Sequence, residues 1–275
     1  MTATLPTGAD IRPALPGMKV TQTRVIQSEW TKFRSLRSSK IILLVSVVLT
    51  IGVSALICAV TASHWTRLDP GDRASFNAVA SSLNGVLISQ LAVGVLGVVL
   101  ISGEYATGMI RSSLTAAPKR LPVLWGKIAV FAGVVGATSL ASTFVSFFLG
   151  QALLTGHDLR VGISSPGALR MVIAAGIYLL LVGIIGMALG CLLRNTAAGI
   201  SSLVALFFVV PPILDLLPKS WSDNIGPYLP ANAGEAFWGH PDTSHLSPWA
   251  GFAVLCAWAA AAVVLAAVRM TRSDA

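Results

Sequence analysis

Six apolar stretches, each long enough to cross a bilayer, constrain the fold of this chain more than any other feature. A helix needs about 20 apolar residues to cross a hydrocarbon core of about 30 Å. The sequence therefore predicts an all-α, polytopic membrane protein with six transmembrane helices. The stretches are residues 41–62, 83–102, 128–154, 171–193, 197–217 and 249–268.

Little of the chain remains outside these stretches. Hydrophobic residues make up 55% of the sequence and charged residues 11%, whereas a soluble domain carries about 25% charged residues. The longest polar pieces are the first forty residues and residues 218–248, and neither is large enough for a catalytic domain with its own core. We expect a disordered cytoplasmic tail over residues 1–19 and a single six-span domain over residues 20–272.

The charges predict the orientation of the chain. If the N-terminus is cytoplasmic, fourteen lysines and arginines fall on the inner side and five on the outer side. This positive-inside bias indicates a multi-pass protein of the cell membrane with both termini in the cytoplasm. The basic residues are spread along the membrane edge rather than gathered on one surface, which favours the lipid bilayer, and not nucleic acid, as their partner.

The predicted spans contain few groups that could do chemistry. Asp215 is the only ionisable residue within them, although proton- and ion-coupled carriers keep such groups at mid-membrane. Any transport is therefore expected to draw its energy from elsewhere. Cys58, Cys191 and Cys256 lack metal-ligand spacing and are expected to be packing residues, so no metal site is predicted. Glycine, serine and threonine are plentiful, and helix packing is preferred over a substrate path for any one of them.

An amphipathic helix is predicted before the first span, at about residues 20–38. Apolar residues recur there at helical spacing among basic ones, which suits a helix lying in the cytoplasmic interface. The alternative is a juxtamembrane segment that only enforces topology. The residues assigned to this interface helix are Glu29, Trp30, Phe33 and Arg37.

An unusually apolar stretch precedes the sixth span, at about residues 218–240. It is too apolar to be free in water, and too short and broken to span. We expect one or two short re-entrant helices that dip toward the outer interface, because irregular backbone at that depth must be covered by protein or water. The alternative is an aromatic-belt loop resting on headgroups. Its large aromatic residues include Trp221, Tyr228, Phe237 and Trp238.

The segment after the second span, residues 103–120, is the most informative cytoplasmic piece. It begins with Glu104 at the membrane edge, continues with apolar residues at roughly helical spacing and closes at Pro118 before a basic pair. A short exposed helix of this kind is a docking element for a partner protein. Glu104 is expected to pair with Arg111 or Lys127 and hold the bend. The alternative is a plain connecting loop.

This segment resembles the cytoplasmic coupling segment of type-2 ABC transporter permeases, the membrane subunits of bacterial ABC exporters. The amphipathic run around Trp30 and Phe33 is similar to the pre-membrane helix of that family, and the six-span layout with a re-entrant stretch also matches. The similarity extends from about Val20 to Arg272. The residues on which the coupling-segment resemblance rests are, in order, Glu104, Gly108, Ile110, Arg111, Leu114, Pro118, Arg120 and Lys127.

The resemblance implies a half-transporter. Two membrane subunits, identical or related, would form the pathway as a homodimer or heterodimer, and a separate ABC ATPase subunit would bind ATP and Mg²⁺ beneath each. This chain would then hold no cofactor and catalyse no reaction. The resemblance assigns coupling to Glu104, Gly108, Ile110, Arg111 and Leu114, lateral bracing to Glu29, Trp30, Phe33 and Arg37, and an outer gate to Trp221, Tyr228, Phe237 and Trp238.

The sequence agrees with a separate ATPase in one respect. It contains no G-x-x-x-x-G-K-S/T phosphate loop, because Leu121 stands where the first glycine would have to precede Gly126 and Lys127. The chain must therefore borrow its energy source if it is a transporter.

Two other functions compete with this one. A membrane-embedded enzyme acting on lipids would need clustered acids or histidines, and Glu235, His240, Asp242 and His245 do gather within eleven residues. That cluster lacks a repeated ligand spacing on a regular element. The other alternative is a noncatalytic membrane anchor or sensor subunit. The cargo cannot be chosen by fold-level analogy.

Overall fold

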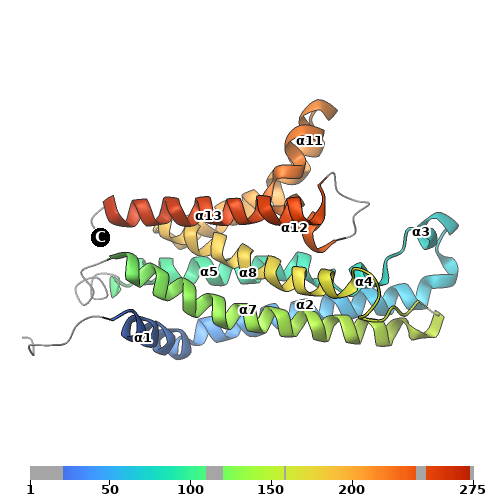
Figure 1. Cartoon of the computed structure of the whole chain (residues 1–275), viewed down its shortest axis with the longest axis horizontal. Coiled ribbons are helices and arrows are strands. Elements are labelled where there is room, and N and C mark those ends of the chain that lie inside the picture. Colours follow the sequence, from blue (N-terminus) through green and yellow to red (C-terminus); the bar gives the residue numbers. More distant parts are fainter. Residues whose placement is uncertain (1–20, 110–119, 158, 240–245, 273–275) are drawn as a thin grey trace, which may run out of the picture.

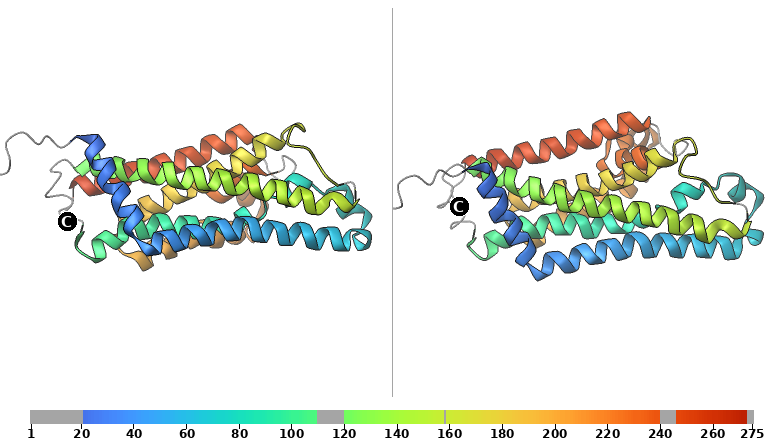
Figure 2. Two further views of the ribbon diagram at one scale, coloured as in Figure 1. Left: turned by 90° about the horizontal axis from the view of Figure 1, so that it is seen from below. Right: turned by 60° about the horizontal axis from the view of Figure 1, so that its bottom comes forward.

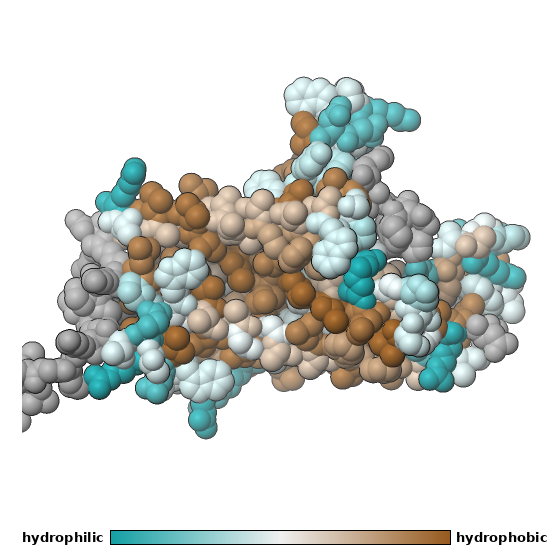
Figure 3. All heavy atoms as spheres, in the orientation of Figure 1, coloured by the Kyte–Doolittle hydropathy of each residue, from teal (hydrophilic) through white to brown (hydrophobic). Residues whose placement is uncertain are grey.

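The computed structural model describes residues 21–109, 120–157, 159–239 and 246–272, and every regular element in these ranges is a helix. Six helical runs are long and apolar enough to cross a membrane, as predicted. Figure 1 shows them as one elongated bundle, with the C-terminal end of α13 and α1 at the same end. Figure 3 shows an apolar band along the middle of the bundle and hydrophilic side chains toward its ends.

The spans differ in detail from the apolar stretches that predict them. They are α2 (Arg37–His64), α5 (Gly85–Ala106), α7 (Arg120–Leu153), α8 (Ala168–Leu193), the run of α9 (Thr196–Val204), η3 (Ala205–Val209) and α10 (Val210–Asp215), and α13 (Pro248–Arg272). The shorter elements are α1 (Gln22–Ser35), η1 (Trp65–Arg67), α3 (Pro70–Ala74), α4 (Ala78–Ser81), η2 (Leu154–His157), α11 (Lys219–Ile225), η4 (Gly226–Tyr228) and α12 (Pro230–Trp238).

Two spans continue as helix well past their apolar stretches. Helix α5 runs to Ala106, and α7 begins at Arg120. Glu104 and Lys127 therefore lie within span helices, although they are outside the apolar stretches in which Asp215 is the only charged residue. The helices continue because their backbone groups need partners near the membrane. The two charges are tolerated because they pair with each other.

Helices α5 and α8 form the centre of the bundle, and glycines bring their backbones together. A Cβ atom added at Gly97 would lie 2.1 Å from the carbonyl oxygen of Gly183, and one added at Gly186 would lie 2.2 Å from that of Gly94. Small residues at helix contacts permit this close approach in membranes. Helices α2 and α9 pack on α5, and α7 and α13 pack on α8.

Buried hydroxyl groups join α2 to α5, and α7 to the turn just before α5. Thr50 donates to the Ser89 hydroxyl at 2.8 Å, and Ser146 donates to the carbonyl of Ser82 at 2.8 Å. The four side chains are all buried within this one chain. This agrees with the expectation that such residues serve helix packing rather than a substrate path.

The fifth span is irregular where it approaches Pro211 and Pro212. Residues 205–209 form a π-helical turn. Proline lacks a backbone donor and disturbs the helix behind it, which accounts for this turn. Beyond the prolines, α11 projects away from the bundle and α12 returns beside α13 (Figure 1).

The glycine contact between α5 and α8 gives a direct test. Changing Gly97→Ala places a methyl group against the backbone of α8 and is expected to cost about 1–3 kcal/mol through overpacking. Gly133→Ala on α7 is the matched control, because nothing lies within 4 Å of its added Cβ. Thermal unfolding in detergent measures both. Equal melting temperatures for the two variants would contradict this packing.

Candidate functional site

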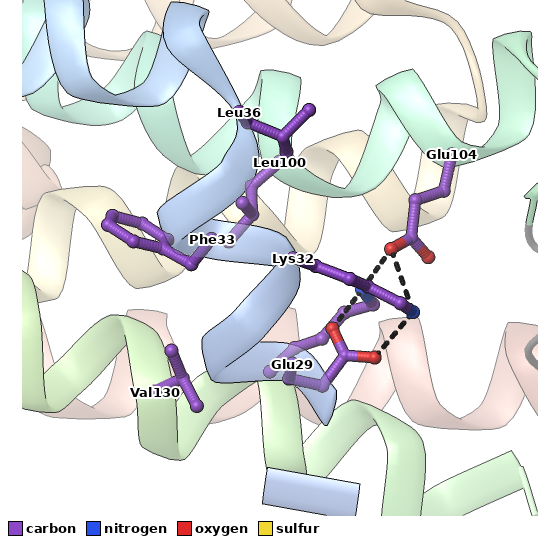
Figure 4. Close-up of a pocket in the computed structure, with 8 residues that line it drawn as sticks. Glu29, Lys32, Phe33, Leu36, Leu100, Glu104 and Val130 are labelled. Carbon is purple, nitrogen blue, oxygen red and sulfur yellow. Dashed lines mark hydrogen bonds and ion pairs between the residues drawn. The ribbon is translucent and has the colours of Figure 1, made fainter. Parts of the chain in front are cut away.

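Four charged side chains from three helices meet at the end of the bundle that holds α1. Lys127 on α7 lies 2.5 Å from Oε2 of Glu29 and 2.5 Å from Oε1 of Glu104, which belong to α1 and α5. Lys32 on α1 lies 2.7 Å from Oε1 of Glu29 and 3.3 Å from Oε1 of Glu104. Figure 4 shows Glu29 and Lys32 facing Glu104, and we call these four residues the charge cluster.

The charge cluster is largely withdrawn from solvent. The side chain of Lys127 is 3% exposed, that of Glu29 6% and that of Glu104 10%, while Lys32 is 26% exposed. Burial of an ion costs several kcal/mol, and the loss is offset only when an opposite charge lies close. Two lysines and two glutamates give this cluster no net charge. Burial of all four charges together therefore costs little, whereas removal of any one of them would leave a buried charge without its partner and destabilise the fold.

Lys32 remains protonated at neutral pH. Burial lowers its pKa, but the hydrogen bond to Glu29 and the charges of Glu104 and Glu29 together outweigh this and raise the pKa above its ordinary value of 10.5. A raised lysine pKa contributes stability that is fully present below the ordinary value and is lost as pH rises through the folded-state value. The ion pairs of Lys32 therefore persist across the physiological pH range.

Close packing of α1 on α7 brings the charge cluster together. Val25 and Phe33, one turn before and one turn after Glu29, are buried with it along one stripe of α1. A Cβ atom added at Gly126 of α7 would lie 2.9 Å from the side chain of Val25, so this glycine admits α1. Figure 2 shows α1 lying obliquely across the end of the bundle.

The four residues assigned to the interface helix occupy different surroundings. Glu29 and Phe33 are buried against the bundle, whereas Trp30 is 49% exposed. Arg37 is exposed and begins α2. The buried stripe of α1 faces protein, and the exposed indole of Trp30 lies outside that stripe.

The residues assigned to coupling are described only in part. Glu104 lies in the last turn of α5, and Gly108 follows that helix with a φ of 71°. This left-handed conformation favours glycine and is common just beyond a helix end. Ile110, Arg111 and Leu114 lie outside the described residues.

The pairing of Glu104 with Lys127 is one of the two partnerships that the sequence predicts. The partnership of Glu29 with Lys127 was missed, because these residues are far apart along the chain and meet only when α1 docks. A signal was nevertheless present. Glu29 is the only acidic residue of α1, and it sits on the stripe that also holds Val25 and Phe33.

The aromatic residues assigned to an outer gate do not form one cluster. Phe237 and Trp238 on α12 are buried, with 4% and 2% exposure, whereas Trp221 and Tyr228 are 58% and 54% exposed. The backbone carbonyl of Tyr228 accepts a hydrogen bond of 2.9 Å from the indole of Trp258 on α13. Trp221 and Tyr228, which are exposed, precede α12, whereas Phe237 and Trp238, which are buried, are its last two residues.

Helix α12 is fastened to α8. Arg170 donates to the carbonyl oxygen of Phe237 at 2.5 Å, close to the C-terminal end of α12. Gly234 lies against the ring of Tyr178, where an added Cβ would stand 2.0 Å from a ring carbon. The Tyr178 hydroxyl in turn donates to Gln90 on α5. The short helix before the sixth span is thus tied to the central pair of spans.

The acidic and histidine residues considered for an enzyme are mostly outside the described part of the chain. Glu235 is described and exposed, while His240, Asp242 and His245 are not described. Within the described ranges, no group of three or more His, Cys, Asp or Glu residues is placed to hold a metal ion. Cys58 and Cys191 are buried free thiols, and Cys256 is partly buried.

Removal of the central lysine tests the charge cluster. Lys127→Ala leaves Glu29 and Glu104 buried without their main partner, which is expected to cost about 3–5 kcal/mol and to release α1. Lys40→Ala removes an exposed lysine near the same end and is expected to have little effect. Thermal unfolding and the rate of tryptic cleavage at Arg34 report the two effects. Similar behaviour of both variants would show that the ion pairs do not hold α1.

Comparison with known proteins supports the similarity noted in the sequence. A family model described as "ABC-2 family transporter protein" matches residues 25–213, which is more than half of the chain. The matched range contains the charge cluster and the helices from α2 to α9. No curated protein matches the sequence. The chain belongs to an ABC-2 type transporter permease family.

Proposed function

We propose that this chain is the membrane-spanning permease subunit of an ATP-driven exporter in the cell membrane. It acts as a dimer, with an identical or related second permease, and is coupled to separate ABC ATPase subunits. Family membership and six candidate spans support the permease role. The charge cluster is the observation that best supports coupling, because two of its members, Glu104 and Lys127, flank the connection between α5 and α7.

The proposed coupling works through the two ends of that connection. Glu104 stands before residues 110–119 and Lys127 stands after them, and the two are joined at 2.5 Å. A push on the connection therefore reaches α5 and α7 together, and it reaches α1 through Glu29. The preference of ATP for the closed ATPase dimer biases the membrane helices between their inward-open and outward-open arrangements.

The energy source belongs to the partner in this proposal. ATP and Mg²⁺ bind the ATPase subunit, since this sequence has no phosphate loop of the P-loop kind. The permease contributes no catalytic group and no cofactor site. Its helices change their relative positions when the ATPase subunits close on ATP.

The orientation of the chain fits an intracellular ATPase. Helix α1 and the end of α13 lie at the same end of the bundle as the charge cluster (Figure 1). The positive-inside bias of the sequence assigns this end to the cytoplasm. The cluster would then lie on the side of the membrane where ATP is present.

Coupling is tested by removing a charge while keeping the shape. Glu104→Gln is expected to lower cargo transport per ATP hydrolysed about tenfold, because allosteric coupling energies of about 1–3 kcal/mol correspond to about 5–150-fold effects. Arg111→Ala is expected to act in the same direction. Asp72→Asn, at the opposite end of the bundle, is the control. ATP hydrolysis and transport are measured together in the reconstituted complex, and full coupled turnover in both test variants would contradict the assignment.

Topology is tested independently of coupling. A reporter fused after Ala275 is expected to be cytoplasmic, and one inserted near Asp72 is expected to be outside, because of the distribution of lysine and arginine. Protease protection in sealed membrane vesicles distinguishes the two sides. The reverse arrangement would overturn the proposed orientation and with it the site of ATPase docking.

A further inference from the structure

A groove lies at the end of the bundle opposite the charge cluster, between the last turns of α7 and the chain that leads to α8. Its volume is about 180 Å³. A single water needs only about 10–15 Å³ by a comparable measure, so the groove admits a much larger group. It is lined by Phe147, Phe148, Gln151, Ala152 and Thr155 from α7 and its extension, and by Arg160, Val161, Gly162 and Ile163 from the connecting chain.

Gln151 holds the two sides of the groove in place. Its amide nitrogen donates to the carbonyl of Ala78 at 3.0 Å and to the hydroxyl of Ser82 at 2.9 Å. Its amide oxygen accepts a 2.7 Å hydrogen bond from the backbone nitrogen of Val161. Gln151 is 3% exposed. The connecting chain is therefore fastened to α7, and the groove is a built feature of the fold.

The lining of the groove combines apolar walls with one cation. Phe147 and Phe148 lie edge to face with ring centroids 5.4 Å apart, and Ala152 and Ile163 add aliphatic surface. Arg160 is the charged residue of the lining, which holds no carboxylate. Its guanidinium forms no ion pair with another described residue. Such a group binds phosphate through two parallel hydrogen bonds.

The groove borders an exposed apolar strip of α7. Phe148 lines the groove and is also 55% exposed, beside the exposed side chains of Val145 and Leu149 on the outer face of α7. This apolar strip belongs to a span helix, and Arg160 follows the end of that helix. An occupant with a phosphate at Arg160 would therefore continue directly into hydrocarbon.

We propose that this groove binds one phospholipid molecule. The phosphate of the lipid pairs with Arg160, and the first part of an acyl chain lies along Phe148 and the outer face of α7. The apolar wall favours this occupant over free inorganic phosphate, which would leave that wall empty. The missing carboxylate disfavours a cationic ligand. The site is separate from the charge cluster, so the proposal does not depend on coupling to an ATPase.

Native mass spectrometry of the full chain in mild detergent tests the proposal. The probe is phosphatidylglycerol, and diacylglycerol with the same chains shows what the phosphate adds. Arg160→Gln is expected to weaken the first lipid-binding step about tenfold, because the charge-assisted hydrogen bonds to the phosphate are lost. Ala152→Phe fills the groove from an exposed position and is expected to weaken the same step. Arg67→Gln, an exposed arginine at the same end, is expected to bind like the unaltered chain.

Each result decides the matter. A selective loss in Arg160→Gln and Ala152→Phe, with tight binding of phosphatidylglycerol and weak binding of diacylglycerol, supports the proposal. Unchanged binding in both variants overturns it. If diacylglycerol binds as tightly as phosphatidylglycerol, the phosphate does not contribute to binding and the proposed pairing with Arg160 is wrong. If added inorganic phosphate binds and displaces phosphatidylglycerol, the groove is a site for free anions and the proposal is wrong. If Arg160→Gln does not fold, Ala152→Phe decides the question alone.

Discussion

The arrangement of the helices at one end of this protein depends on a single buried ammonium group. Lys127 lies between carboxylates that come from α1 and α5, and it belongs to α7. Three segments separated along the chain are thereby joined at one point. Because each of these charges would be costly if buried alone, the helices can separate only if water or another charge replaces the lost partner.

Polar groups that are withdrawn from water need partners within the protein, and this requirement also shapes the rest of the molecule. Backbone groups in hydrocarbon must be satisfied internally, so the chain crosses as helices and its polar contacts are buried within the bundle. Glycines bring α5 and α8 into contact at the centre, and Gly126 does the same for α1 and α7. At the opposite end, Arg170 satisfies a carbonyl at the end of α12. Polar side chains are thus used at both ends of the bundle to position short helices.

Much of the fold could be predicted from the sequence because the bilayer imposes length and apolarity on each span. The pairing of Glu104 with Lys127 was also foreseeable, since both residues border the same short connection. The role of Glu29 was not, because it depends on how α1 docks, and helical spacing alone does not say what a helix packs against. Trp30 and Phe33 were both assigned to the interface helix, but only the docking of α1 determines that Phe33 is buried and Trp30 is exposed. The separation of Trp221 from Trp238 likewise follows from the packing of Gly234 on Tyr178, a contact between distant segments.

Cross-linking across the contact between α1 and α7 shows whether the charge cluster holds α1 in place. Gln22 donates to the carbonyl of Pro122 at an exposed position of this contact, at 3.1 Å. A chain with Gln22→Cys and Pro122→Cys, treated in native membranes with a short thiol cross-linker, reports whether α1 is docked. We expect a high yield of internal cross-link, and this yield should fall sharply when Lys127→Met is added. A yield unaffected by that change would show that α1 is held without the charge cluster.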